Sequence, residues 1–442
     1  MEEEITVEME NNPSRPERTL RPIVYASWFL GVGVARPSKC PKPITVILRL
    51  FHFGVCTVIV AFSAMDFANF GKEFTSKLFE IMYCMNETVC HVSSYYYVYH
   101  VMRHYDKWPE LMRMMESLDD HIGKELPIND NGVKIRQILA ILTVCLFGPV
   151  SLTVHVLYYF FTDPEQIFAS DLLLYYTIAQ TLANSFVYDI VVYMICLRFR
   201  TINETIKGLD ERSGAYWAAL KIRRIRKLHN GTSRDFLNMF LFCLFLAEAC
   251  TVIMTVNDIY GVDMLLCSTN SFIMVVAKLF RIYMSAAEQK NGFIFLNNVI
   301  WMIYGWQFIV MCWVCTLTHR EINKIGPYIG EFVLNAQHST KFNKMAAFRK
   351  FRYKGGTPLN ICEDQSAMNL NGFGMESLLR TNFERDCVRN EANDFSLQLQ
   401  QHRVKFTACD FFEMDNSLLT RFISVITTYL IILVQFYKPD GL

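Results

Sequence analysis

An apolar run over 417–437 is long enough to cross a lipid bilayer, and polar residues recur within it at helical spacing. One face of a helix there carries Ser424, Thr428, Ile431 and Gln435. Lipid offers polar groups no hydrogen bond, so this stripe requires water or a neighbouring helix. The spacing leaves two interpretations open: a helix that packs through hydroxyl hydrogen bonds, or the wall of a water-filled pore.

Aromatic and polar side chains form similar stripes in four other apolar runs. As candidate lining of a ligand pocket we single out Tyr83, Glu87, His91, Tyr158, Gln180, Asn184, Tyr188, Asn297, Trp301 and Tyr304. Convergent rings with a few amides and hydroxyls suit a small polar or amphipathic ligand. For each Tyr or Trp alone, interfacial anchoring or core packing is the alternative. Glu87 is an intramembrane carboxylate, which indicates either a ligand-binding group or a structural hydrogen-bond acceptor.

The composition favours an integral membrane protein of several helices. The 442 residues are 52% hydrophobic and 19% charged, and the net charge of +1 gives no reason to expect a nucleic-acid partner. The 14 cysteines are scattered through apolar runs and loops, where we interpret most as small packing residues. His100 and His104 could hold zinc from one helical face, but we interpret them as ordinary interfacial residues. We expect no metal and no cofactor.

The hydropathy pattern predicts seven membrane-spanning helices, each long enough to cross the hydrocarbon core. They cover residues 44–66, 77–101, 135–161, 172–196, 260–284, 293–317 and 417–437. An eighth apolar stretch, over 236–254, is interpreted as an inner helix or an inner extension of the fifth span. Arg49 lies near the inner end of the first span, from which it can reach the headgroups.

Basic residues fix the expected direction of the chain. With the N-terminus inside and seven spans, the inner segments hold 34 Lys and Arg, whereas the outer segments hold only Lys72, Lys290 and Lys438. This is a strong positive-inside bias. The fold class we predict is therefore an all-α membrane protein of seven transmembrane helices, with a cytoplasmic N-terminus and an extracellular C-terminus.

Two other classes of membrane protein are disfavoured, and so are enzymes. The predicted direction is opposite to that of a G-protein-coupled receptor, and that class's Asp-Arg-Tyr and Asn-Pro-x-x-Tyr motifs are missing. A secondary transporter would show paired broken helices or an internal repeat, which we do not find. The chain has no Walker loop, H-E-x-x-H or G-x-S-x-G motif, so we predict that it is not an enzyme.

Several segments resemble those of insect gustatory receptors, which belong to the insect chemoreceptor superfamily. The last span carries Thr428-Tyr429, five aliphatic residues and then Gln435-Phe436, a pattern similar to that family's terminal signature. Phe406-Thr407-Ala408-Cys409 resembles the segment that leads into its last helix, and Val256 to Gly261 resembles the start of its fifth. One departure is the apolar stretch from Gly231 to Met254, which is either an insertion or translated intron.

The resemblance implies a ligand-gated cation channel in which four subunits surround a central pore, as a homotetramer or with other gustatory receptors. The last helix would line the pore, so that the stripe ending at Gln435 becomes its wall and Phe436 its gate. An aromatic ring can close a narrow pore by dewetting it, although Phe436 could also be an interface anchor. The stimulus would be a small-molecule tastant, and the location the lipid plasma membrane of sensory neurons.

We accordingly expect four regions along the chain. Residues 1–43 form a cytoplasmic N-terminal segment, and 44–317 contain the first six helices, their inner loops and the ligand pocket. Residues 318–416 are a cytoplasmic segment that contributes to the subunit contact, and 417–442 hold the pore-lining helix with a short extracellular tail.

The expected direction of the chain can be tested with epitopes at its two ends. A tag fused after Leu442 should be labelled by antibody on intact cells, because the C-terminus is expected outside. A tag fused before Met1 should be labelled only after the cells are permeabilised. Labelling in the opposite pattern would contradict the predicted fold.

Overall fold

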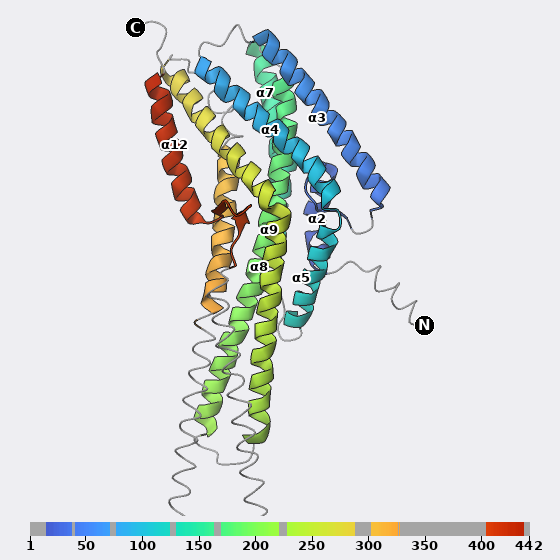
Figure 1. Ribbon diagram of the computed structural model, residues 1–442, viewed down its shortest axis with the longest axis vertical. Coiled ribbons are helices and arrows are strands. Elements are labelled where there is room, and N and C mark those ends of the chain that lie inside the picture. Colours follow the sequence, from blue (N-terminus) through green and yellow to red (C-terminus); the bar gives the residue numbers. More distant parts are fainter. Residues whose placement is uncertain are drawn as a thin grey trace, which may run out of the picture. The chain divides into compact units, whose positions relative to one another are not determined.

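The computed structural model is almost wholly helical in the part of the chain that it describes (Figure 1). Described are residues 15–37, 40–70, 77–123, 130–162, 169–220, 228–287, 302–325, 327 and 404–436. The chain divides into two compact units. The first comprises Met1–Leu197, Thr251–Thr318 and Lys405–Leu442, and the second comprises Arg198–Cys250 and His319–Val404.

The elements follow one another as long helices with a single small hairpin near the end. In chain order they are α2 (Arg15–Phe29), α3 (Lys42–Phe70), α4 (Lys77–Arg103), α5 (Lys107–Gly123), α6 (Asn131–Leu142), η1 (Thr143–Phe147), α7 (Gly148–Thr162), α8 (Ala169–Leu220), α9 (Leu228–Ala287), β1 (Thr407–Ala408), β2 (Phe412–Glu413) and α12 (Asn416–Phe436). A further helix covers 302–325. α9 runs unbroken through 236–254, so this apolar stretch is helical and continuous with the helix of the predicted fifth span.

Five helices in the described part of the chain are long and apolar enough to cross a membrane. They are Lys42–Met65, Asn131–Val154, Tyr175–Glu204, Ala247–Phe280 and Asn416–Gln435. The predicted second span coincides with α4, which has 27 residues but carries several charged and amide side chains. The predicted sixth span begins outside the described residues, and its remainder lies in the helix over 302–325.

A short π-helix interrupts the third apolar helix just before a proline. η1 covers Thr143–Phe147, and Pro149 follows at the second position of α7. Proline has no N–H to donate to the carbonyl four residues earlier, so the helix must widen or bend there. The sequence thus places this irregular turn in the middle of an otherwise regular membrane-length helix.

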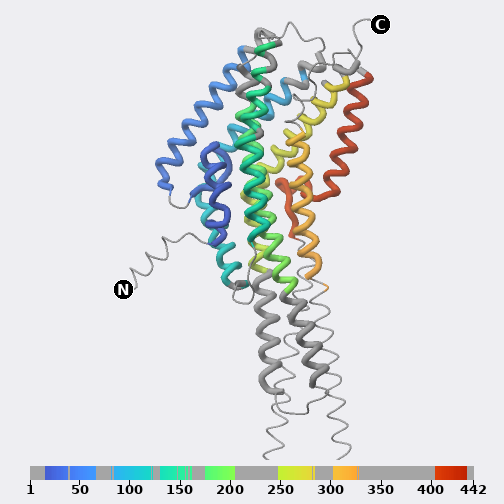
Figure 2. The backbone as a smooth tube through the Cα atoms, turned by 180° about the vertical axis from the view of Figure 1, so that it is seen from behind, coloured from blue at the N-terminus to red at the C-terminus, as the bar shows by residue number. Residues whose placement is uncertain are grey.

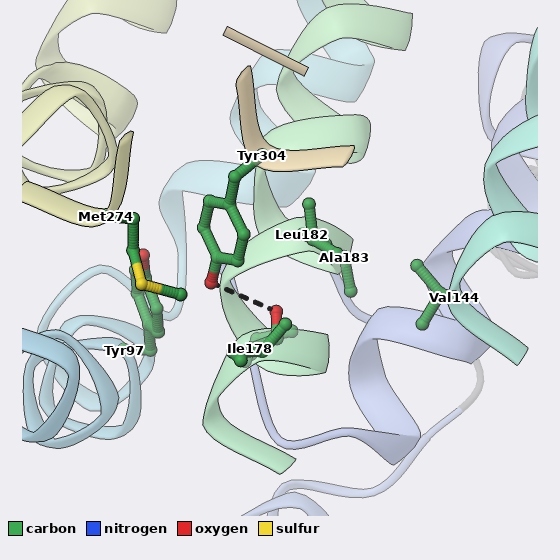
Figure 3. Close-up of a cluster of buried hydrophobic side chains, with 8 residues drawn as sticks. Tyr97, Val144, Ile178, Leu182, Ala183, Met274 and Tyr304 are labelled. Atoms are coloured by element: carbon green, nitrogen blue, oxygen red, sulfur yellow. Dashed lines mark hydrogen bonds between the residues drawn. The ribbon is translucent and has the colours of Figure 1, made fainter. Parts of the chain in front are cut away.

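The core of the first unit lies where α4, α8, α9 and the helix over 302–325 meet. A cluster of buried side chains from these helices and from the loop after α2 includes Tyr97, Ile178, Met274 and Tyr304. Figure 3 shows the Tyr304 hydroxyl pointing at the Ile178 carbonyl oxygen, to which it donates a hydrogen bond of 3.5 Å. Burial of these rings and aliphatic chains holds the four helices together.

A buried loop connects α2 to α3. Residues Gly31 to Ala35 are all buried, and Gly31 and Gly33 adopt φ values of +77° and +69°. Only glycine enters this left-handed region without a steric penalty. Backbone carbonyl groups in the loop cannot reach water, so side chains of α3 and α8 supply their hydrogen bonds, as described below.

Gly31→Ala should destabilise the protein strongly. A Cβ at this position would lie 2.3 Å from His52 Cδ2, and the left-handed backbone alone costs an alanine roughly 1–2 kcal/mol. We expect a clear fall in the melting temperature of the purified protein.

Gly54→Ala is the matched control for this change. Gly54 lies within α3, and a Cβ there meets nothing within 4 Å, so alanine should hold or raise the melting temperature through its better helix propensity. Equal melting temperatures for the two variants would show that the loop does not require Gly31.

Candidate functional site

The polar stripe of α12 lies on a face that the described part of the chain leaves uncovered. Ser424, Thr428 and Gln435 are exposed, and Ile431 is 53% exposed. The hydroxyls bond within their own helix: Ser424 Oγ donates to Thr420 O at 3.1 Å, and Thr428 Oγ1 donates to Ser424 O at 3.0 Å. These hydroxyls therefore do not join α12 to a neighbouring helix.

The opposite face of α12 packs on the helix bundle, and Figure 2 shows α12 (red) running beside the helix over 302–325 (orange). Ile426 and Leu433 form a buried cluster with Val276 and Phe280 of α9. The ring of Phe422 stands 4.4 Å from that of Phe308, centroid to centroid, and 5.5 Å from that of Phe272. α12 is thus attached by its apolar face, and its polar face is turned away from the residues that the structure describes.

The start of α12 is fixed by two hydrogen bonds. Asp415 Oδ1 accepts the backbone N–H of Leu418 at 2.9 Å, which is the usual action of an N-cap residue. Thr316, in the helix over 302–325, accepts the N–H of Asn416 through its Oγ1 at 2.9 Å. The first turn of α12 is therefore tied to the helix that also carries Tyr304.

The predicted pocket residues of α4 face different surroundings. Glu87 is buried and accepts a hydrogen bond of 2.5 Å from Ser63 Oγ of α3. The half-buried His91 has an Nε2 atom with no hydrogen-bond partner in the described part of the chain. Glu87 thus makes the structural hydrogen bond that the sequence left open as its alternative role.

The predicted pocket residues of α8 hold the loop after α2. Gln180 Nε2 donates to Leu30 O at 3.0 Å and to Tyr176 Oη at 2.9 Å. Asn184 Oδ1 lies 2.7 Å from the point where a Cβ on Gly33 would stand, so this glycine is needed for the close approach. Gln180 Oε1 and Asn184 Oδ1 are buried and have no hydrogen-bond partner in the described part of the chain.

Tyr188 and Tyr304 are packed in the interior at separate places. Tyr304 belongs to the core cluster of Figure 3, whereas Tyr188 stacks edge-on against Tyr260 and Phe406, with centroid separations of 5.6 and 6.3 Å. The remaining predicted positions lie outside the described side chains: Tyr83, Tyr158, Asn297, Trp301 and Phe436.

A hairpin formed by β1 and β2 precedes α12, and the sequence analysis missed it. Its strands pair antiparallel, with Thr407 opposite Glu413 and Ala408 opposite Phe412. Cys409 and Asp410 at its turn have φ values of 50° and 60°, which non-glycine residues rarely adopt. Asp410 Oδ1 accepts a hydrogen bond of 2.9 Å from Thr407 Oγ1, which stabilises the turn.

The side-chain amide of Asn257 in α9 makes two hydrogen bonds to the hairpin segment. Asn257 Nδ2 donates to Lys405 O at 2.6 Å, and Asn257 Oδ1 accepts the N–H of Thr407 at 3.3 Å. One turn later Gly261 allows close contact, because a Cβ there would stand 3.2 Å from Cys409 N and 3.4 Å from its Sγ. The two segments singled out from the sequence for their resemblance therefore contact each other.

A salt bridge and a buried contact between His100 and Asp263 lie beside this junction. Asp258 accepts a hydrogen bond from Lys107 of α5, and this bond raises the pKa of the Lys107 ammonium. His100 is fully buried and its Nδ1 lies 3.1 Å from Asp263 Oδ2, in contact by distance but without the alignment of a hydrogen bond. We interpreted His100 as an ordinary interfacial residue, whereas its side chain is buried against Asp263 of α9, 163 positions away in the sequence.

A model of the 7tm chemosensory receptor family matches residues 20–352 and 379–438, which is most of the chain. The chain belongs to this family. It is a family of receptors, not of enzymes, and the match confirms the resemblance to insect chemoreceptors drawn from the sequence.

The chain is also similar to one curated protein and to two solved structures. Over 89 residues the receptor is 36% identical to "Putative gustatory receptor 2a" of Drosophila melanogaster, a match that spans 19% of this chain and 21% of that protein. The insect olfactory receptor OR5 from Machilis hrabei shares the fold, with a TM-score of 0.51, 11% identity, and coverage of 95% of this chain and 98% of that one. The same olfactory receptor in complex with eugenol aligns with a TM-score of 0.49 and 12% identity, covering 96% and 98%.

The docking of the hairpin on α9 can be tested by a disulfide bond. Gly261→Cys should cross-link to the native Cys409, because the new Cβ would lie 3.6 Å from Cys409 Cα. Burial and the Asp410 and Asp263 carboxylates raise the pKa of the Cys409 thiol, so the oxidation should proceed faster at alkaline pH. Mass spectrometry of the peptides would detect the bond.

The matched controls are Gly261→Ala, which adds the Cβ without a thiol, and the double variant Gly261→Cys, Cys409→Ser. Neither should form the cross-link. Free thiols at both positions in the oxidised Gly261→Cys variant, present at the cell surface, would show that the hairpin does not lie on α9.

Proposed function

We propose that this receptor is a ligand-gated cation channel of four subunits, opened by a small-molecule tastant in the plasma membrane of sensory neurons. The observation that carries the proposal is the uncovered polar face of α12, with Ser424, Thr428 and Gln435 exposed along a membrane-length helix. Such a face requires water or a second subunit. Four copies around an axis would supply both.

The proposed topology has seven spans, the N-terminus inside and the C-terminus outside. It is supported by the 34 basic residues of the inner segments and by the family match. The proposed subunit contact uses 318–416 and the inner ends of the later helices, as a homotetramer or together with other gustatory receptors. Within the second unit, Asn203 Nδ2 joins two of these parts by donating to Glu321 O at 2.8 Å.

The proposed ligand pocket lies among α4, α8, α9 and the helix over 302–325. Its support is an unusual concentration of buried polar atoms that have no hydrogen-bond partner in the described part of the chain. They include His91 Nε2 and Ser94 Oγ of α4, Ser268 Oγ of α9 and Gln307 Oε1 of the helix over 302–325. Buried groups are nearly always paired, and those that are not often bind water or a ligand. Amide, hydroxyl and imidazole groups beside Tyr97 and Tyr304 suit a small molecule that carries both polar and apolar parts.

The proposed route from the pocket to the pore is the hairpin. Asn257 holds β1 on α9, Thr316 holds the first residue of α12, and Tyr188 of α8 packs on Phe406 beside β1. A shift of α8 or α9 upon ligand binding would therefore move the base of α12. Rigid elements joined by a few polar contacts can transmit such shifts.

The pore assignment is tested by single-channel recording from two variants. Gln435→Ala should change conductance or ion preference, because it removes the amide at the end of the stripe. Phe436→Ala should raise ligand-independent current several-fold, because it removes the ring proposed to close the pore. Both variants should leave ligand binding nearly unchanged.

Ile423→Ala is the matched control, since Ile423 is 57% exposed and points about 100° away from Ser424 on the same helix. It should behave as wild type. If Gln435→Ala and Phe436→Ala receptors reach the surface with wild-type conductance, selectivity and resting current, α12 does not line the pore.

A further inference from the structure

The exposed face of α2 changes from basic to aromatic along the helix. Arg18 and Arg21 near its start are exposed, and near its end Tyr25 is 43% and Phe29 71% exposed. Arg18, Tyr25 and Phe29 follow one another at helical spacing, so they share one side of α2. The Arg21 guanidinium stands 5.6 Å from the centroid of the Tyr25 ring. The face therefore presents positive charge at one end and aromatic rings at the other.

The two arginines of this face have no carboxylate partner in the described part of the chain. Neither makes an ion pair there, whereas Arg15, at the start of the same helix, lies 3.5 Å from Asp130. We expected Arg49 to reach the lipid headgroups, and this expectation was wrong: its side chain is fully buried, and its Nη2 donates to Gly33 O at 3.5 Å. The arginines of α2, by contrast, are open to their surroundings.

α2 runs beside the first half of a membrane-length helix and in the same direction (Figure 2). Gln137 Nε2 of α6 donates to Thr19 O of α2 at 2.6 Å, and beyond the end of α2 Val32 packs in one cluster with Val144. Val144 stands about 20 Å past the start of α6, near the middle of the apolar span Asn131–Val154. The start of α2 is thus level with the beginning of this span, and its end lies at membrane depth.

Pro22 marks the level at which the exposed face of α2 leaves water. It is exposed and has no N–H, so the Arg18 carbonyl lacks the hydrogen bond that residue 22 of a regular helix would donate. Hydrocarbon cannot replace this bond, but water among lipid headgroups can. Phe29 stands two helical turns, or about 10 Å, beyond Pro22. The face therefore extends from the headgroups to the acyl chains.

The neighbouring helix α5 shows the contrasting case of a face that suits water alone. Its exposed positions include Glu110, Arg113 and Asp120, and none of the large hydrophobic side chains described in α5 is exposed. α2 contacts α5 and buries an apolar side of its own, yet Tyr25 and Phe29 remain on its outer side. The exposed rings of α2 are therefore not a general property of the amphipathic helices in this part of the chain.

We propose that the exposed face of α2 binds an anionic phospholipid. Arg18 and Arg21 hold the headgroup, because guanidinium groups match the oxygens of phosphate and carboxylate, and the acyl chains lie along Tyr25 and Phe29. The negatively charged cytoplasmic leaflet attracts basic segments of this kind. The choice of leaflet rests on the proposed direction of the chain, but the binding itself does not. Bound lipid would hold α2, and the buried loop that follows it, on α5 and α6.

Photo-cross-linking in the full-length receptor can capture whatever occupies this face. p-Benzoylphenylalanine in place of Tyr25 keeps an aromatic ring beside Arg21. The receptor is reconstituted in nanodiscs of equal parts phosphatidylserine and phosphatidylcholine with the same acyl chains, illuminated, and digested for mass spectrometry. We expect lipid adducts in which phosphatidylserine exceeds phosphatidylcholine at least five-fold, because each basic residue near an anionic surface contributes roughly that factor to binding. Channel activity plays no part in this readout.

Arg18→Gln should lower the ratio of phosphatidylserine to phosphatidylcholine adducts several-fold. Arg113→Gln is the matched control: Arg113 is an exposed arginine on α5, whose face carries no exposed ring, so its loss should leave the ratio unchanged. The cross-linker in place of Glu110 should give no lipid adduct. If the receptor with the cross-linker at position 25 does not fold, the same label in place of Phe29 should give the same ratios.

Four outcomes would overturn the proposal. Equal adducts of the two lipids, or an equal loss of preference in Arg18→Gln and Arg113→Gln, would show that the face does not select an anionic headgroup. Adducts with a second copy of the chain would make it a subunit contact. Adducts with residues 1–14 of the same chain would assign it to that acidic segment, which holds Glu2, Glu3, Glu4, Glu8 and Glu10. A lack of any adduct would show that the face meets only water.

Discussion

The side-chain amide of Asn257 takes the place of a strand. A two-stranded hairpin leaves backbone donors and acceptors free along its outer edges, and on the side of β1 these belong to Thr407 and to Lys405, which lies just before the strand. Asn257 both donates to and accepts from this edge, as a backbone peptide of a third strand would. Because α12 begins three residues after β2, the position of that helix on the bundle depends on this contact as well as on its own apolar face.

The same constraint shapes the loop between α2 and α3. Backbone groups buried in a membrane-length helical assembly need partners, and a loop inserted among helices offers several carbonyls at once. Here Gln180, His52 and Arg49 take the carbonyls of Leu30, Phe29 and Gly33. Polar residues at helical spacing in α3 and α8 are therefore explained in part by the loop that they enclose, before any ligand is considered.

Elements that a continuous run of apolar residues marks could be predicted from the sequence. The last span was placed at 417–437 and the helix covers Asn416–Phe436, because one continuous apolar run sets its length and the N-cap Asp415 fixes its start. The hairpin escaped detection because strands of two residues show no alternation, and its turn uses Cys409 and Asp410 where glycine would be the usual signal. The contact of Asn257 with the hairpin could be suspected only from the resemblance of both segments to one family.

Side-chain contacts between residues far apart in the sequence could not be predicted. Hydropathy assigns Arg49 and His100 to span ends, where either could reach water, and it carries no record of what packs on them. Their burial follows from partners far along the chain, Gly33 with Tyr176 and Asp263 respectively. The same limit applies to the candidate pocket. Its polar stripes could be found from residue spacing, but spacing does not show that Gln180 and Asn184 face the loop after α2 while Glu87 faces α3.

The hydrogen bonds that hydroxyl groups donate within α12 have an electrostatic consequence. Ser424 and Thr428 each use their only proton on a carbonyl of the preceding turn, so what remains on the uncovered face is the lone pairs of their oxygens. A conduit walled by several such helices would therefore present partial negative charge at successive levels, with no ionised side chain among these hydroxyls. A preference for cations over anions would then follow from the helix geometry itself. A passing sodium or calcium ion meets acceptors, while chloride meets no donor from either hydroxyl.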